Sequence, residues 1–344
     1  MKVITLSAAL LAATAFTAPA FANDTMAELK AGGLYYINSE NVQMAQEDLY
    51  LSMKEVRVDY VFHNSGDTDE TSVIAFPMPD VEGSGDFMVT IPNENSDNFM
   101  DFSVSVEGKE VKTKLDQHAF AAEVDVTALL RKYNVPLQPY GQATSQALNG
   151  LSEDVLKDMM SRGMVVNIPY SDTADGPMKD DYVPMWKLKT TYWWTNTFPA
   201  GSDVHVSHRY KPSVGGTTGL RFLNYGDGER FSGETFDQEK IQYCMDDGFL
   251  KSVGKRLDAA GPDETPLVEN WMSYVLTTGQ NWGGTIGKFH LTVDKGDPNN
   301  LISFCGNGIK KTGPTTFEMS ADDFYPEKDI DLMILVKPDW NQPQ

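Results

Sequence analysis

The sequence predicts a mainly β protein, an antiparallel β-sandwich with a small helical insertion. Apolar and polar residues alternate through long runs, as expected for strands with one buried face. Clusters of Pro, Gly and Asn separate these runs and supply the turns. Helical patterns are confined to short stretches between the strand-like runs, which argues against a doubly wound α/β fold.

A first β region is expected over residues 23–125. Val56, Val58 and Tyr60 share one parity while Arg57 falls on the other, which is the period of a half-buried strand. Further strands of this region are expected over residues 72–76, 87–91, 102–106 and 111–115.

Residues 126–184 are predicted to form a helical insertion and a connector. A short helical pattern spans residues 126–133, and a second helix is expected between Ser152 as N-cap and Gly163 as the C-terminal stop. The methionines of this second helix lie at helical spacing, which favours core packing over metal or partner-helix binding. Prolines and aspartates interrupt residues 165–184, so this stretch is predicted to be a loop or connector.

A second β region is expected over residues 185–344. Trp186 and Leu188 share the parity predicted to face the core, and a Pro-Gly turn joins their run to a second one at 204–210 as a hairpin. The rest of the region is expected to contain a surface loop over 217–237, a helix over 238–258 and strands over 273–278, 288–294, 301–305, 315–319 and 330–336.

Residues 1–22 predict a signal peptide. Lys2 gives a positive start, residues 3–16 form an apolar run, and Ala20-Phe21-Ala22 is the small-x-small pattern that signal peptidase reads. A membrane anchor is the alternative, but a bilayer span needs about 20 apolar residues. We therefore expect cleavage before Asn23, a periplasmic or secreted location, and no transmembrane anchor after cleavage.

The charge balance narrows the class of partner. The 344-residue chain has 28 Lys and Arg against 49 Asp and Glu, a formal net charge of −21. Nucleic acids and anionic membrane surfaces both require clustered positive charge, so neither is an expected partner of this acidic protein. Hydrophobic residues make up 41% of the chain, which is enough for a packed core.

Cys244 and Cys305 are the two cysteines of the chain. In an oxidising compartment a lone pair is most simply a disulfide. A redox pair is the alternative, but catalytic dithiols are usually close in sequence as Cys-x-x-Cys. A bridge that closes a loop of roughly 60 residues would stabilise the fold by about 4 kcal/mol on the chain-entropy model.

Several short segments together resemble one family. They include VIAFPMPD at residues 73–80, HRYKP at 208–212 and YVLTTG at 274–279, and the others lie at 23–25, 31–34, 47–49, 198–201, 281–282 and 304–306. On these motifs and their order, the chain resembles the exported bacterial proteins of the domain of unknown function 4424 family. The resemblance covers essentially the whole mature chain. It implies an envelope location and no assigned reaction.

The sequence predicts no catalytic residues, no cofactor and no metal site. It contains no His-Glu-x-x-His, Gly-x-Ser-x-Gly, phosphate-binding or dinucleotide-binding motif. His205 and His208 have metal-like spacing, but on a strand they point to opposite faces. With 49 acidic residues, no pair of carboxylates stands out as the acid pair of a hydrolase.

Trp193, with Lys187 and Lys189, is the predicted binding group. If Trp186 and Leu188 face the core, Trp193 faces outward on the same side as the two lysines. An exposed Trp beside Lys side chains suits a sugar or peptide ligand. The alternative, which the pattern favours slightly, is that another layer covers Trp193.

These observations favour a non-enzymatic envelope protein that binds or assembles a protein, peptide or glycan partner. The alternative is a carboxylate-dependent hydrolase of envelope polysaccharide or peptide, supported by the abundance of acidic residues and surface aromatic residues. A calcium- or transition-metal-binding stress protein is a third hypothesis, and the scattered Met and His residues argue against it.

Overall fold

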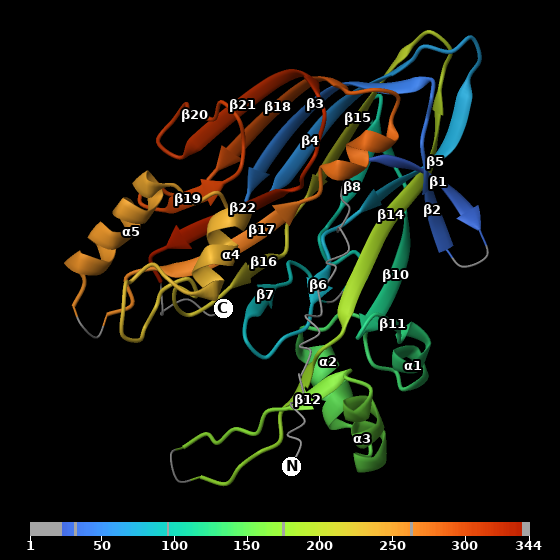
Figure 1. The fold of residues 1–344 in the computed structure, drawn as a ribbon. Coiled ribbons are helices and arrows are strands. Elements are labelled where there is room, and N and C mark those ends of the chain that lie inside the picture. Colours follow the sequence, from blue (N-terminus) through green and yellow to red (C-terminus); the bar gives the residue numbers. More distant parts are fainter. Residues whose placement is uncertain (1–22, 31–32, 95, 174–175, 262–263, 339–344) are drawn as a thin grey trace, which may run out of the picture.

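The computed structural model describes residues 23–30, 33–94, 96–173, 176–261 and 264–338. The predicted signal peptide, residues 1–22, lies outside the described residues. The described chain forms stacked β-sheets with a helical lobe at one end and two helices on an outer face (Figure 1). The predicted mainly β sandwich with a small helical part is therefore confirmed.

One layer of the sandwich is the β3 sheet. Its strands follow the order β20 (Lys310–Lys311), β21 (Thr316–Phe324), β18 (Ile286–Asp294), β3 (Val42–Ser52), β4 (Val56–Asn64), β15 (Asp203–Tyr210), β8 (Ser103–Val106) and β9 (Lys109–Val111). Its neighbouring strands are antiparallel except β3 and β18, which run parallel. The sequence did not predict this parallel pair.

Two further sheets pack against the β3 sheet. The β14 sheet has the order β11 (Val124–Asp125), β10 (Lys114–Ala121), β14 (Lys187–Phe198), β5 (Glu70–Pro77), β1 (Thr25–Lys30) and β2 (Gly33–Ile37), and β6 (Val81–Glu82) also pairs with β14. The β17 sheet has the order β19 (Leu301–Phe304), β22 (Ile330–Val336), β17 (Val268–Tyr274), β16 (Val214–Gly216) and β7 (Met88–Thr90).

A single apolar cluster fills the space between these sheets. It contains Phe62 from the β3 sheet, Phe76 from the β14 sheet and Leu332 from the β17 sheet, all completely buried. The alternation read from the sequence places these side chains, since every second residue of each strand faces inward. Strands from residues 23–125 and from residues 185–344 therefore share one core.

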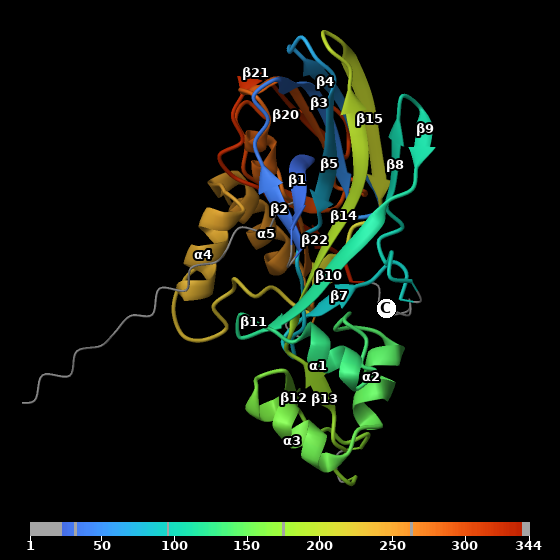
Figure 2. The same cartoon turned by 90° about the vertical axis from the view of Figure 1, so that its right-hand side faces the viewer.

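A helical lobe lies beyond one end of the sandwich (Figure 2). It contains α1 (Thr127–Lys132), α2 (Gln142–Asn149), α3 (Glu153–Ser161), β12 (Val165–Asn167) and β13 (Tyr182–Pro184). Its own apolar cluster includes Leu130, Leu148, Met159 and Trp186. Ser152 precedes α3 in an extended conformation and Gly163 follows it with φ +68°, as the sequence predicted. The core-packing interpretation of Met159 is confirmed, whereas α2 was not predicted.

The described residues of 165–184 form a hairpin and not the loop or connector that their prolines and aspartates predicted. β12 and β13 pair antiparallel, and backbone bonds from Ile168 N to Asp181 O (2.8 Å) and from Tyr170 N to Lys179 O (3.0 Å) extend the ladder. Pro169 falls between these two donors, so its missing N–H interrupts no cross-strand bond. We call the described residues of 165–184 the arm, which projects from the lobe in Figure 1.

Two helices cover the outer face of the β17 sheet. α4 (Glu234–Gln242) and α5 (Asp247–Ala259) replace the single helix predicted over 238–258. The break falls at Cys244, which has φ +53°. Phe249 and Val253 of α5 pack with Met333 and Leu335 of β22.

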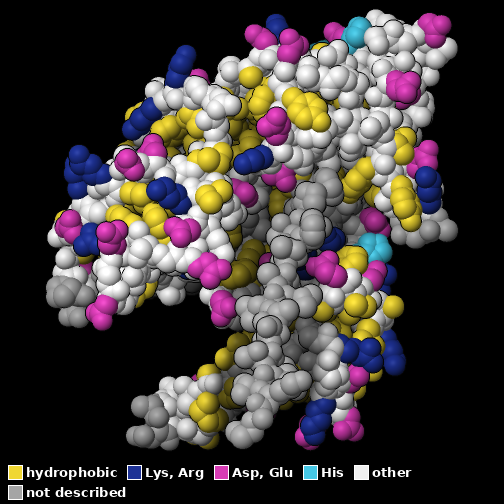
Figure 3. Space-filling view, viewed as in Figure 1, with side chains coloured by type: hydrophobic (Ala, Val, Ile, Leu, Met, Phe, Trp, Pro, Cys, Tyr) yellow, Lys and Arg dark blue, Asp and Glu magenta, His cyan; other side chains and the backbone are white. Residues whose placement is uncertain are grey.

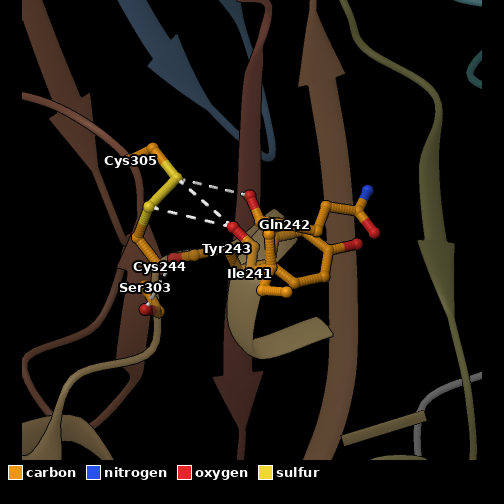
Figure 4. Close-up of a disulfide and its surroundings, with 6 residues drawn as sticks. All are labelled: Ile241, Gln242, Tyr243, Cys244, Ser303 and Cys305. Atoms are coloured by element: carbon orange, nitrogen blue, oxygen red, sulfur yellow. Dashed lines mark hydrogen bonds between the residues drawn. A yellow bond between two sulfur atoms is a disulfide. The ribbon is translucent and has the colours of Figure 1, made fainter. Parts of the chain in front are cut away.

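A sulfur bridge ties this helical layer to the sheet (Figure 4). The sulfur atoms of Cys244 and Cys305 lie 2.03 Å apart, at disulfide-bond distance. Nearby, Ser303 Oγ donates to Tyr243 O at 2.9 Å. Within the described part of the chain, no helix combines the length and apolar character needed to cross a bilayer.

Candidate functional site

A cleft of about 880 Å³ separates the end of the sandwich from the helical lobe. Figure 3 shows the molecule hollowed between its main body and the arm. The cleft takes residues from both sides: 84–88 and 90, 214 and 216–218, 268 and 270, and 336–338 from the sandwich, and 139–141, 145 and 181–184 from the lobe. Ligand sites commonly occupy such junctions between packed units.

Glycines bring the wall of the cleft close to the lobe. A Cβ at Gly83 would lie 2.5 Å from Pro184 O, and one at Gly85 would lie 2.5 Å from Ile168 Cδ1. Real Cβ atoms do not approach so closely, so the small residues permit this contact. The Gly83-Ser84-Gly85 segment between β6 and β7 thereby seats the arm.

Tyr140 fixes the lobe side of the cleft. Its hydroxyl donates to Glu82 O at 2.7 Å, which links the lobe to β6. Burial raises the pKa of Tyr140 to about 12, so the phenol remains a neutral donor at physiological pH. Two residues later, Gln142 N donates to Glu94 Oε2 at 3.4 Å, placing a carboxylate at the start of α2.

One face of the arm continues the cleft as an exposed apolar row. Val166, Ile168 and Tyr170 are 37%, 43% and 48% exposed. The pairing places Val183 opposite Val166, and Asp181 opposite Ile168. Residues directly opposite in a hairpin share a face. We call this row the arm face. Its opposite partners Asp181 and Val183 line the cleft, as do Tyr182 and Pro184, whereas the three row residues themselves do not.

A strand edge and an exposed methionine lie on the other side of the cleft. β7 ends the strand order of the β17 sheet, with β16 as its partner among the described strands. Met88 at its start is 65% exposed. An edge strand offers backbone donors and acceptors to an added strand. The cleft therefore combines an open edge with two apolar rims.

The titratable groups of the cleft are two aspartates, two tyrosines and one lysine: Asp86, Asp181, Tyr140, Tyr182 and Lys337. The carboxyls whose pKa burial raises to about 8, Glu47 and Glu269, do not line it. Glu269 Oε1 accepts from Arg221 N in the segment before α4, and Glu239 of α4 raises the pKa of Glu269 further. A hydrolase site would require an acid of raised pKa next to a second carboxylate, and neither Glu47 nor Glu269 supplies that acid to the cleft.

The predicted binding residues lie outside the cleft. Trp194 is buried at 3% exposure and Trp193 faces the opposite side of β14, as the parity predicted. Trp193 is half-buried, and Lys114 Nζ lies 4.4 Å from its ring centre. Lys189 Nζ lies 3.2 Å and Lys187 Nζ 3.9 Å from Asp80 Oδ2. These cations are engaged within the protein, and the binding role of this group stays a prediction.

His205 and His208 point to opposite sides of β15, as expected. His205 is exposed and lies beside Glu107, with 3.3 Å between Nδ1 and Oε1. His208 is buried, and its Nε2 lies 3.1 Å from Asp24 Oδ2. Among the described residues, no group of three or more His, Cys, Asp or Glu side chains is arranged to hold a metal ion.

Comparison with known proteins identifies a family. The family model described as "Domain of unknown function (DUF4424)" matches residues 22–334. The chain belongs to this family. No curated protein matches it. Among solved structures, a "putative nutrient binding protein" from Legionella pneumophila is similar, with 15% sequence identity and a TM-score of 0.42 over 92% of this chain and 70% of that one.

Sequence reasoning missed the arm face, although a signal was present. Val166, Ile168 and Tyr170 alternate with Asn167 and Pro169, which is the period of a strand. The prolines and aspartates of the surrounding stretch outweighed that short alternation. The cleft itself has no local signal, since it forms between segments far apart in the sequence.

Proposed function

We propose that this member of the DUF4424 family binds an extended segment of a protein or peptide partner in the cleft and along the arm face. The arm face carries the proposal. Val166, Ile168 and Tyr170 form an apolar row that the fold leaves exposed, and Asp181 and Val183, opposite this row in the hairpin, line the cleft. Exposed apolar surface next to a groove is typical of interaction sites.

The shape of the site favours an extended partner. β7 presents a strand edge on one side, and the arm is itself a projecting two-stranded ribbon on the other. An added strand would gain main-chain hydrogen bonds from such an edge and side-chain contacts from the apolar rims. Asp86 and Asp181 on the lining, together with the net charge of −21, favour a partner segment carrying Lys or Arg.

We also propose that the chain acts in the bacterial envelope after removal of residues 1–22. The leader-like pattern of those residues and the cysteine pair at disulfide-bond distance support this location. N-terminal sequencing of the protein from an envelope fraction tests it. A first residue of Asn23 is expected, and a protein recovered from the cytosol with Met1 intact would contradict it.

A photo-crosslinking experiment tests the binding proposal. A benzoylphenylalanine residue replaces Ile168 on the arm face or, as the matched control, the exposed Leu29 of β1, which is 56% exposed. Each mature protein is irradiated in an envelope extract and the adducts are digested with protease or with glycan-cleaving enzymes. A discrete adduct at position 168 that protease removes is expected.

The other outcomes decide against the proposal. An adduct at position 168 that only the glycan-cleaving enzymes remove would identify a glycan ligand instead of a polypeptide. Equal labelling at positions 168 and 29, or none at either, would contradict binding at the arm face. The hydrolase alternative would have to use Asp86 and Asp181, since the carboxyls with raised pKa lie outside the cleft.

A further inference from the structure

The first described residues lie inside the protein rather than at its surface. Asn23, Asp24 and Thr25 are all completely buried. Asn23 N donates to Thr278 Oγ1 at 2.8 Å, and Thr278 Oγ1 donates to Asn23 O at the same distance. Trp282 Nε1 donates to Asp24 O at 2.7 Å. After the predicted cleavage Asn23 would be the mature N-terminus, and because termini are usually poorly ordered and exposed, its burial requires a reason.

Asn23 joins a buried cluster of ionisable side chains. Its Nδ2 donates to Glu47 Oε2 at 3.2 Å, and its Oδ1 accepts from the Tyr60 hydroxyl. Tyr274 donates to Glu47 Oε1 at 3.4 Å and lies 3.1 Å from the Tyr60 hydroxyl. Burial raises the pKa of both phenols well above 10, so they stay neutral.

The cluster holds more acid than base. Its carboxyls are Asp24 and Glu47, both completely buried, and its basic side chain is His208, beside Asp24. Glu47 accepts hydrogen bonds from neutral groups, and Asp24 Oδ1 has no hydrogen-bond partner among the described residues. Burial raises the pKa of Glu47 to about 8. A buried carboxylate without a cation is costly, so Glu47 stays protonated near neutral pH unless a cation lies beside it.

The predicted cleavage would create a cation at this position. Cutting between Ala22 and Asn23 converts the Asn23 peptide nitrogen into an α-amino group, which ordinarily has a pKa of about 8 and three N–H donors when charged. The Asn23 nitrogen already lies 2.8 Å from Thr278 Oγ1. The side chain of Asn23 also donates to Glu47, and the next residue along the chain is Asp24. Peptide-bond hydrolysis consumes one water and leaves the carboxylate on Ala22.

We propose that the α-ammonium group of Asn23 supplies a cation beside these buried carboxyls, so that removal of the leader completes the core. The uncut precursor then carries two buried acids with His208 beside Asp24, whereas the mature chain adds an α-ammonium group. Strand β1, which begins two residues later and pairs with both β5 and β2, is anchored by the same event. Processing and final stability are thereby coupled.

A thermal comparison of two N-termini tests this inference. The mature chain beginning at Asn23 is compared with a chain that keeps Ala20-Phe21-Ala22, each made by removing a cleavable fusion partner. The extended chain is expected to melt several degrees lower, because its Asn23 nitrogen carries no charge. In Glu47→Gln versions of both chains the gap should shrink, since the cation then has one carboxylate fewer to neutralise.

The matched control is Asp48→Asn on the same strand, since Asp48 is exposed beside His290 and faces away from the cluster. This variant should keep the full gap. Equal melting temperatures of the mature and extended wild-type chains would overturn the inference, as would a gap of the same size in the Glu47→Gln pair.

Chemical labelling gives a readout that does not depend on the Glu47 variant folding. The mature wild-type chain is treated with an amine-acetylating reagent at neutral pH, and mass spectrometry of the N-terminal peptide gives the rate. Labelling in the folded protein should be slower than in urea by more than about tenfold, because the amine reacts only after local opening. Equal rates in the two conditions, or a mature protein that begins elsewhere than Asn23, would refute the proposal.

Discussion

The sandwich core and the arm face are both built from apolar side chains at alternating strand positions, yet only the core is covered. Phe62 and Phe76 are completely buried between sheets, whereas Ile168 and Tyr170 remain nearly half exposed. Burying a large apolar side chain contributes about 1.5–3 kcal/mol to folding. Phe62 and Phe76 gain this contribution because other residues of the same chain bury them. The arm residues do not, and we propose that the surface that covers them belongs to another molecule.

Matched truncations should show the largest contrast between the two regions. Phe76→Ala removes a ring that stacks on Phe102 at 5.1 Å and lies 4.8 Å from His208, so a loss of about 3–5 kcal/mol is expected. Tyr170→Ala removes an exposed ring and should change stability by less than about 0.5 kcal/mol. Urea unfolding of both variants measures this. Comparable losses would show that the arm face is part of the folding core.

Loss of the Cys244–Cys305 bridge gives the next largest expected effect. The bridge ties the α4–α5 layer covalently to the β17 sheet. The double variant Cys244→Ser/Cys305→Ser should lose about 2–4 kcal/mol of unfolding free energy, since the bridge restricts a long loop in the unfolded chain. Dithiothreitol should produce the same loss in the wild type and none in the variant. A dithiothreitol effect that persists in the variant would show that the bridge is not the cause.

A smaller, pH-dependent effect distinguishes the interior carboxyl Glu269 from those of the cleft. Burial, reinforced by the neighbouring Glu239, raises the pKa of Glu269 from 4.5 to about 8. Because the folded protein binds this proton more tightly than the unfolded chain, protonated Glu269 adds to the free energy of unfolding. This contribution is fully present below about pH 4.5 and is lost as the pH rises through 8. Glu269→Gln keeps an oxygen acceptor for Arg221 N and should reduce this loss by about 1–3 kcal/mol.

Chemical unfolding at a series of pH values between 4.5 and 8 measures the slope. Asp181→Asn makes the same carboxyl-to-amide change on an exposed side chain and is expected to track the wild type. If Glu269→Gln shows the same pH dependence of the unfolding free energy as the wild type, the buried carboxyl is not its cause.

The sequence predicted what depends on local period. Alternation located the strand around Val58, the apolar run 330–336 located the strand around Leu332, and the parity of Trp186 separated buried Trp194 from outward Trp193. The cap at Ser152 and the stop at Gly163 defined α3. Each of these features is decided by residues a few positions apart, so a single chain carries the full signal.

What the sequence could not predict depends on tertiary proximity. The Asn23–Glu47–Tyr274 cluster joins residues up to 251 positions apart, counted from Asn23 to Tyr274, and no spacing rule connects them. The parallel pairing of β3 with β18 is likewise non-local. The break between α4 and α5 follows from the backbone turn at Cys244, where the sequence pattern had predicted one continuous helix over 238–258.

The most direct test is the affinity of the arm face for the polypeptide recovered by crosslinking at position 168. Isothermal calorimetry compares the wild type, the Ile168→Ser/Tyr170→Ser variant and the Leu29→Ser control. The account predicts that the arm variant binds at least about tenfold more weakly while melting at the wild-type temperature, because its exposed side chains contribute to binding and not to folding. Unchanged affinity of the arm variant, or an equal loss in the Leu29→Ser control, would contradict it.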